Sequence, residues 1–399
     1  MPGPLDGIRV LDISTMLAAP LAAQILGDYG ADVIKVEHPV RPDSLHNHGV
    51  KVNGFSLYWK QVARNKRCVA IDFSTEEGAK LLLEMVAKAD VVIENFRPGT
   101  LARWGLGWEQ LQAANPNIIV LRITGYGQYG PYSGQAAFGT VVEAMSGLAA
   151  ITGEADGGPI LPNFGLADSI AGVTGAGAVA MALYHRDAKG GGGQEIDLSL
   201  LAPIMSAVGI GPAIYQKTGA LQSRLGSRGD GGTAPRNVYK TVDGGWVALS
   251  AVAQSVADRV FTVIGHEEYL ELPWFQTNSG RWDHVDEVDA LVGEWIGARS
   301  QEEVLRLFSE AGAAIGPVNT AKDILEDPQV IAAQFLVHIE DNDVGDVVQN
   351  APLFKMSKTP GKIRFLGAAH ASSSDEVFEL ELGKSKDELE KLRANGVIA

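Results

Sequence analysis

The first 125 residues alternate between short apolar runs and helical patterns, and this alternation restricts the fold more than any other feature of the sequence. The strand-like runs are Ile8–Ser14, Asp32–Glu37, Val69–Phe73, Val91–Glu94 and Ile118–Ile123. Helical patterns fill Pro20–Gly30 and a segment that begins behind a Ser74-x-x-Glu77 capping box and reaches Ala89. Such repetition predicts an α/β fold with a parallel, doubly wound sheet. Ligands bind these sheets beyond the carboxyl ends of the strands, which directs attention to residues 12–17, 37–42, 94–99 and 124–130.

The pattern changes after Asn163. Asp168 is followed by SIAGVTGAGAVAMALYHR, a helical segment so rich in Gly and Ala that another element must pack against it with nearly touching backbones. Asn237–Thr241 and Trp246–Ala251, joined by an Asp243-Gly244 turn, predict an antiparallel hairpin, and helical patterns follow it. We therefore expect a large domain over residues 1–224 and a smaller α+β domain over residues 225–330.

Charge and composition exclude several classes of protein. The formal net charge of −15 repels nucleic acid and anionic membranes, so we expect neither as a partner. Cys68 is the only cysteine and the eight histidines are scattered, so we expect no disulfide and no metal site. The amino terminus shows no signal pattern, and the uncharged run Leu198–Gln216 is broken by proline and glycine. A cytoplasmic protein is the expectation.

One glycine motif suggests a dinucleotide site but lacks its context. Gly125-Tyr-Gly-Gln-Tyr-Gly130 matches G-x-G-x-x-G and follows a predicted strand. Pro131 and Gly134 come next, so no helix N-terminus is available for a pyrophosphate. We expect a glycine-rich turn that lines a cleft, and no nicotinamide binding.

Basic residues follow two of the predicted strands. Lys60 and Arg64-Asn-Lys-Arg67 form one group, while Arg97 and Arg103 follow Val91–Glu94. In an acidic chain, such a cluster suggests a rim that binds phosphate through charge-assisted hydrogen bonds. A solvated run of surface charge is an equally simple interpretation.

Asp168 also has two interpretations. At the start of a helix, it is by default an N-cap, worth ~1 kcal/mol. The helix dipole also favours its ionised form, and an ionised carboxylate can attack an electrophilic carbonyl. Gly165, three residues earlier, would let a substrate approach closely.

Six segments form an ordered pattern: PLDGIRVLDIS, AAPLAAQILGDYGADVIKVEHP, NKRCVAIDF, DVVIENFRPGTLARWGLGWEQL, NPNIIVLRITGYGQYGP and FGLADSIAG…ALYHRD…GGGGQEIDLSL. Together they resemble the family III CoA-transferases, the CaiB/BaiF family that includes formyl-CoA transferase. The resemblance implies a Rossmann-like, CoA-binding large domain that residues 331–399 complete. It also implies an interlocked homodimer of two ring-like chains, with CoA at the strand ends.

Carried over by position, the family's nucleophile falls on Asp168. Its CoA-contacting positions fall on Met16, Leu17, Lys66, Asn95, Phe96, Arg97 and Arg103. His38 departs from the family, since formyl-CoA transferase has an arginine there that contacts CoA, and the resemblance leaves open whether His38 or Arg41 makes that contact in this chain. The related α-methylacyl-CoA racemases carry a His-Asp pair where this chain has Ser133–Gly139, which favours transferase over racemase.

The expected reaction is transfer of CoA from an acyl-CoA to a carboxylic acid through an aspartyl anhydride and an aspartyl-CoA thioester. It needs no bound cofactor, with CoA entering as substrate. The turns Gly125–Gly130 and Gly229–Gly232 are candidate oxyanion donors, and Arg224, Arg228 and Arg236 are candidate partners for the second carboxylate of an acid such as succinate. A solvated loop is the alternative for those arginines, and a noncatalytic CoA-binding module is the alternative for the whole protein.

Overall fold

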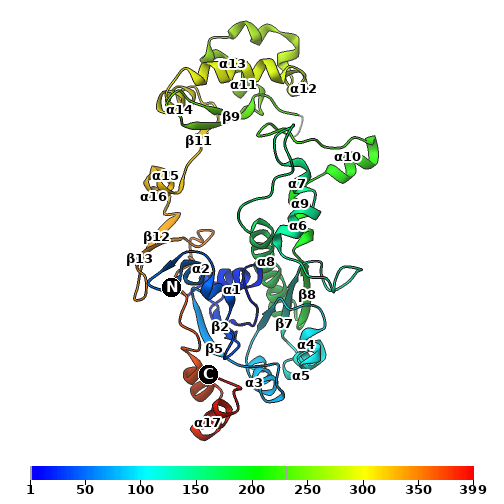
Figure 1. Cartoon of the computed structure of the whole chain (residues 1–399), viewed down its shortest axis with the longest axis vertical. Helices are drawn as coiled ribbons and strands as arrows, with labels where there is room; N and C mark the ends of the chain where they lie inside the picture. Colours follow the sequence, from blue (N-terminus) through cyan, green and yellow to red (C-terminus); the bar gives the residue numbers. More distant parts are fainter. Residues whose placement is uncertain (1, 230–231) are drawn as a thin grey trace. The chain divides into compact units, whose positions relative to one another are not determined.

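The computed structural model describes residues 2–229 and 232–399, which form two compact units (Figure 1). The first unit contains the chain up to Leu148, together with Pro162–Gly209 and Gln329–Ala399. The second unit contains Ala149–Leu161 and Ile210–Pro328. The carboxyl-terminal segment therefore returns to the unit in which the chain begins.

A six-stranded parallel sheet, in the order β5-β2-β1-β6-β7-β8, forms the centre of the first unit. Its strands are β1 (Arg9–Asp12), β2 (Asp32–Glu37), β5 (Lys66–Ala70), β6 (Val91–Glu94), β7 (Ile119–Thr124) and β8 (Gln194–Ser199). Val10 pairs with Val33 on one side and with Val91 on the other. The chain runs outward from β1 to β5 and then continues on the other side at β6. The strand order thus reverses between β1 and β6, where doubly wound sheets bind their ligands.

Helices cover both faces of this sheet (Figure 1). On one face, α1 (Ala18–Asp28) packs against α8 (Leu166–Lys189). On the other lie α3 (Glu76–Val86), α5 (Trp108–Ala114), η4 (Glu376–Glu381) and α17 (Lys386–Ala394). A Cβ at Gly172 of α8 would lie 2.9 Å from the Ala18 carbonyl oxygen, so these helices are in near backbone contact, as the Gly/Ala-rich pattern predicts.

The remaining elements of the first unit are short. They are η1 (Ser44–Asn47), β3 (Lys51–Val52), β4 (Phe55–Ser56), α2 (Leu57–Val62), α4 (Thr100–Arg103), α6 (Gly139–Met145), α9 (Leu201–Val208), β12 (Leu336–Asp341) and β13 (Gly345–Asn350). The helix α7 (Leu148–Ile151) begins where the first unit ends, and α16 (Pro328–Ala333) spans the later boundary. By length and composition alone, α8 could cross a membrane, but it packs on the sheet and 44% of its most apolar stretch is buried.

The second unit contains a three-stranded antiparallel sheet in the order β11-β10-β9. The strands are β9 (Arg236–Lys240), β10 (Trp246–Ser250) and β11 (Ile315–Pro317), and the first two form the predicted hairpin. Its helices are α10 (Gly211–Thr218), α11 (Gln254–Ile264), η2 (Glu267–Glu271), η3 (Pro273–Gln276), α12 (Asn278–Asp283), α13 (Val285–Gly297), α14 (Gln301–Glu310) and α15 (Ala321–Glu326).

Two local expectations were wrong. Thr75, and not Ser74, is the N-cap of α3, because its hydroxyl oxygen accepts the Gly78 N–H at 3.1 Å. The strand expected over Val69–Phe73 instead spans Lys66–Ala70. Its first residues are charged and were not counted as strand, although ion pairing allows them to be buried.

Candidate active site

The loops after β1 and β6 meet at the point where the strand order reverses. The Thr15 N–H donates to Asn95 Oδ1 at 2.9 Å, and Asn95 Nδ2 donates back to the Thr15 carbonyl at 2.7 Å. At the end of β6, Glu94 Oε2 accepts the Phe96 N–H at 2.6 Å, while Arg122 pairs with Oε1. Burial raises the pKa of Glu94 to about 7 despite the charge of Arg122. This reciprocal bonding fixes the two loops against each other.

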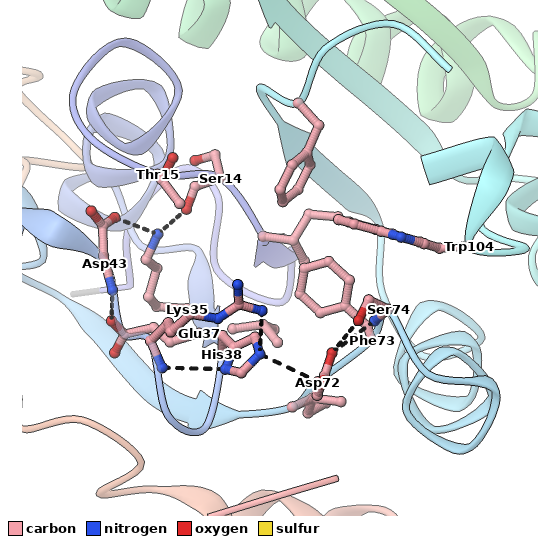
Figure 2. A pocket seen from close by; sticks show the side chains of 15 residues that line it. Ser14, Thr15, Lys35, Glu37, His38, Asp43, Asp72, Phe73, Ser74 and Trp104 are labelled. Carbon is pink, nitrogen blue, oxygen red and sulfur yellow. Dashed lines mark hydrogen bonds and ion pairs between the residues drawn. The ribbon is translucent and has the colours of Figure 1, made fainter. Parts of the chain in front are cut away.

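A cavity of about 340 Å³ opens on one side of these loops (Figure 2). Phe73, Phe96 and Trp104 pack edge to face along one wall. His38 and Arg41 contribute basic groups, and Arg41 Nη2 lies 2.8 Å from His38 Nε2. An aromatic wall facing basic groups suits a nucleotide that carries phosphate.

Glu37, at the carboxyl end of β2, lines the same cavity. Its Oε1 accepts the Asp43 N–H at 2.9 Å and contacts His46 Nε2 at 3.0 Å. Oε2 has no hydrogen-bond partner among the residues that the structure describes. A buried, unpaired carboxylate oxygen at this position can accept a ligand hydroxyl or amine.

Two further cavities, of about 220 and 440 Å³, share four lining residues. The shared residues are Met16, Leu17, Phe138 and Asp168. The smaller cavity is also lined by Asn95, Phe96 and Arg97, and the larger one also by His48, Tyr58 and Asn163. Asp168 therefore lines two cavities, a smaller one that contains Arg97 and a larger one that contains His48, Tyr58 and Asn163.

Asp168 is the third residue of α8, whose N-cap is Gly165, so the N-cap interpretation of Asp168 was wrong. Its carboxyl group lies against Gly139, where a Cβ would come within 2.3 Å of Asp168 Oδ2. Burial, and then the charge of Glu143, raises the pKa of Asp168 above its usual value. A carboxylate of raised basicity, exposed to two cavities, is suited to attack an acyl carbon.

Glu143 belongs to α6 and is itself buried, with 2% exposure. Its Oε1 accepts the Ala167 N–H at 2.9 Å. This bond satisfies one of the free N–H groups in the first turn of α8, where Gly165 provides no side-chain cap. Glu143 thus holds the helix end that carries Asp168 and adds negative charge beside it.

The structure brings most of the expected contact residues together. Met16, Leu17, Asn95, Phe96 and Arg97 line the same cavity as Asp168. Arg103, in α4, is exposed and donates to Thr100 Oγ1 at 3.0 Å, outside the three cavities.

Lys66 does not belong to this group. It is fully buried, and its Nζ donates to Asp12 Oδ2 at 2.8 Å and to the Pro20 carbonyl at 2.7 Å. Burial outweighs the charge of Asp12 and lowers the pKa of Lys66. We therefore leave Lys66 out of the binding rim.

The rest of the basic run is also engaged inside the fold. Lys60 contacts Asp341 and Asp343 at 3.0 and 2.6 Å, and Arg64 pairs with Asp28 at 2.6 Å. The run is therefore neither a phosphate rim nor a solvated surface. It holds the carboxyl-terminal return of the chain.

The Gly125–Gly130 turn is not followed directly by a helix, since α6 begins only at Gly139. The Asp197 carboxylate of β8 accepts the Gln128 N–H at 2.9 and 3.0 Å, which fixes this turn. Gly127 lies in the left-handed region with φ 85°, close to the same carboxylate.

In the second unit, the arginines near Gly229 have protein partners. Arg228 pairs with Asp286 and Asp289 at 2.8 and 2.7 Å, and Arg224 donates to the Gly157 carbonyl at 2.8 Å. Arg236 lines an open groove and lies 3.5 Å from the Ser227 carbonyl. Within the expected oxyanion loop Gly229–Gly232, residues 230 and 231 lie outside the described residues.

Comparison with known proteins places this geometry in a family. The model of CoA-transferase family III matches residues 5–367. The succinyl-CoA–D-citramalate CoA-transferase of Chloroflexus aurantiacus is 37% identical, covering 100% of this chain and 98% of that protein. Human succinyl-CoA:glutarate CoA-transferase is 32% identical, and the match covers 89% of this chain and 81% of that protein. A crystal structure of a CaiB/BaiF family protein from Brucella suis is 31% identical, with a TM-score of 0.83, and covers 96% of this chain and 100% of that one. The chain therefore belongs to CoA-transferase family III and is a CoA-transferase.

Proposed function

We propose that this enzyme moves CoA from an acyl-CoA such as succinyl-CoA to a dicarboxylic acid, with Asp168 as the nucleophile. The observation that carries the proposal is the position of Asp168, which lines two cavities of different character. One cavity continues past Phe96 and Arg97, which suits the thioester end of CoA. The other presents His48, Tyr58 and Asn163, which suits a small polar acid.

The chemistry begins with attack of an Asp168 carboxylate oxygen on the thioester carbonyl. The C–S bond breaks, CoA leaves as a thiolate, and a mixed anhydride remains on Asp168. The thiolate then attacks the aspartyl carbonyl, which releases the donor acid and leaves an aspartyl-CoA thioester. The acceptor carboxylate reverses both steps. Each exchange conserves one activated acyl bond, so no proton or electron has to be supplied.

The environment of Asp168 supports this role. Its raised pKa increases the basicity of the attacking oxygen, while the group stays ionised above that pKa. Gly139 and Gly165 leave the carboxyl group uncovered: a Cβ at Gly139 would lie 2.3 Å from Asp168 Oδ2 and one at Gly165 would lie 3.3 Å from it.

The nucleotide end of CoA fits the cavity of about 340 Å³. The ring wall of Phe73, Phe96 and Trp104 offers stacking surface, while Arg41 offers charge for a phosphate. Glu37 Oε2 would accept a ribose hydroxyl or an amine of the base. Arg97 and Arg103 remain the rim residues proposed for the other phosphates.

A dicarboxylate acceptor is supported by the names of the relatives and by the lining of the cavity of about 440 Å³. Relatives of this chain are named for citramalate, malate and glutarate. Among the residues that line the cavity, His48 is the one basic side chain, and Tyr58 and Asn163 add hydrogen-bond donors. These side chains are therefore our candidates for holding the second carboxylate. Arg224 and Arg228 are not, because protein groups already engage them.

The alternatives have less support. A racemase needs an acid and a base beside the α-carbon, but Ser133, Gln135 and Phe138 line the equivalent part of the cavity. A nicotinamide enzyme would need a helix start directly after Gly130, and the chain forms a turn there.

The decisive experiment compares wild type with Asp168→Asn. The variant should lose more than about a thousandfold in kcat, because a neutral amide cannot form the anhydride. Wild type incubated with succinyl-CoA should carry a hydroxylamine-sensitive mass on the peptide that contains Asp168.

Stability provides the control. Asp168 has a raised folded-state pKa, so its contribution to stability is lost as the pH rises through that pKa. The neutral Asn should therefore unfold at the same temperature as wild type at pH 8, or at a higher one. Full activity in Asp168→Asn, or exchange without any adduct, would show that Asp168 is not the nucleophile.

We also propose that the enzyme works as a homodimer. The side chains of Val173, Met181 and Tyr184 on α8 are 50%, 75% and 61% exposed in a single chain. Exposed apolar groups on one helix face favour contact with a second copy.

A further inference from the structure

Met16 has an unusual backbone. Its φ is 66°, in the left-handed region that a long side chain rarely adopts. Residues in this region are strained, and they keep the conformation only where the surrounding structure imposes it. Met16 also lines both cavities that contain Asp168. The strained residue therefore lies in the wall of the proposed active site.

Asp43 is the group that holds this backbone. Its carboxylate accepts the Met16 N–H at 3.1 and 3.2 Å and the Leu45 N–H at 3.0 Å. The Asp43 side chain is only 1% exposed, so water does not compete for these bonds. Nothing in the chemistry above uses Asp43.

A buried ion pair keeps Asp43 in place. Lys35 Nζ lies 3.2 Å from Asp43 Oδ2 and also donates to the Ser14 carbonyl, as Figure 2 shows. Burial lowers the pKa of Lys35, but the charges of Asp12 and Asp43 outweigh it and raise that pKa overall, so Lys35 stays charged. Lys35 and Asp43 thus hold the loop after β1 through the Ser14 carbonyl and the Met16 N–H.

We propose that Asp43 is a positioning residue of the CoA-transfer reaction, which clamps the strained Met16 backbone so that the loop keeps its place beside Asp168. The inference rests on the proposed function, because only chemistry at Asp168 gives the position of this loop a kinetic consequence. The competing view is that Asp43 only caps η1 and pairs with Lys35. The two views differ in what a glycine at position 16 should do.

The test is a double-mutant cycle on kcat with succinyl-CoA and a dicarboxylic acid. Asp43→Ala removes both oxygens that accept the Met16 N–H and should lower kcat by about 10- to 100-fold, since small displacements near the reacting atoms cost that much. In the Met16→Gly background the same change should cost less than about twofold, because glycine adopts positive φ without strain. In the Met16→Ala background, which also removes the long side chain but keeps the strain, the loss should persist.

Equal losses in all three backgrounds would overturn the proposal, and so would an unchanged kcat in Asp43→Ala. Residue-resolved hydrogen exchange gives a readout that needs no activity. The Met16 amide should exchange faster in Asp43→Ala than in wild type, while the Thr15 amide, bonded to Asn95, should not. Unchanged protection at Met16 would refute the clamp. Inactive wild type with faster exchange would refute the proposed function alone.

Discussion

At the scale of single residues, the sequence singled out Asp168 as the candidate nucleophile but did not show the groups that act on it. Asp168 was chosen because the chain resembles a family in an ordered set of segments. Only the structure shows that Asp168 lies inside α8 and not at its N-cap. Glu143 was missed because one acidic residue in the apolar segment Val141–Met145 gives no sign of being buried. Its partner, the Ala167 N–H, lies 24 residues away in the sequence, and no local pattern reports such a contact.

Glu143→Gln should change the pH dependence of the reaction. The amide keeps an oxygen for the Ala167 N–H but removes the negative charge that helps to raise the pKa of Asp168. In the proposed mechanism activity requires ionised Asp168, so it should rise with pH through that pKa. Removing the charge lowers the pKa, and the acid limb of kcat/KM should shift to lower pH.

Glu143→Gln leaves unchanged the other titratable side chains that line the cavities of Asp168. Arg97 lies in one cavity and His48 and Tyr58 in the other, and the variant leaves all three intact. Glu109→Gln, on the exposed surface of α5, serves as the matched change and should leave the acid limb in place. A limb that stays fixed in Glu143→Gln, or moves to higher pH, contradicts this account.

At the scale of elements, apolar periodicity predicted the parallel sheet well, because its central strands are almost wholly apolar. β2 spans the expected Asp32–Glu37 and β6 the expected Val91–Glu94. Apolar periodicity did not predict α2, the start of β5 or the turn between them, where the buried positions include Lys60, Arg64 and Lys66. Such residues resemble surface in a sequence, and their partners Asp28 and Asp341 lie far along the chain. Burial of paired charge cannot be read without knowing the pairs.

The Arg64–Asp28 pair should matter for stability more than a surface pair does. Arg64 Nε and Nη2 donate to both carboxylate oxygens of Asp28, with exposures of 2% and 1%. Arg64→Met leaves a buried carboxylate without its cation and should lower the free energy of unfolding by about 3–5 kcal/mol.

Adding Asp28→Asn to Arg64→Met should recover more than half of that loss, because the unpaired charge is gone. Lys80→Met breaks an exposed pair with Glu76 and should leave the free energy of unfolding almost unchanged. Urea denaturation followed by tryptophan fluorescence measures all of these variants. A double variant as unstable as Arg64→Met would show that lost packing, and not the unpaired charge, is the cause.

At the scale of the whole molecule, the net charge of −15 has to be reconciled with an anionic substrate. Several basic side chains near the sheet are buried in ion pairs and cannot bind a ligand. Lys35 pairs with Asp43, and Lys66 pairs with Asp12. The cations left at the cavities are few, chiefly Arg41 and Arg97. Attraction of CoA is therefore local, and we expect its affinity to fall with added salt.

The family resemblance also implies that two chains interlock. An interlocked dimer predicts a particular mass and a particular exchange behaviour. The native particle should have twice the 42.3 kDa mass of one chain. Chains that thread through each other can part only by unfolding, so tagged and untagged dimers mixed after purification should form no hybrids over days. Refolding the same mixture from urea should produce them.

Met181→Glu tests where the copies meet. Met181 is 75% exposed in one chain and lies on the same face of α8 as Val173 and Tyr184. A charge buried there in the dimer should reduce the yield of dimer on refolding. Lys386→Glu, exposed at the start of α17 on the opposite face of the sheet, should not. Sedimentation velocity at micromolar concentration measures the outcome. A monomeric wild type would contradict the dimer, and rapid exchange between folded dimers would contradict interlocking while leaving an ordinary, separable interface on α8.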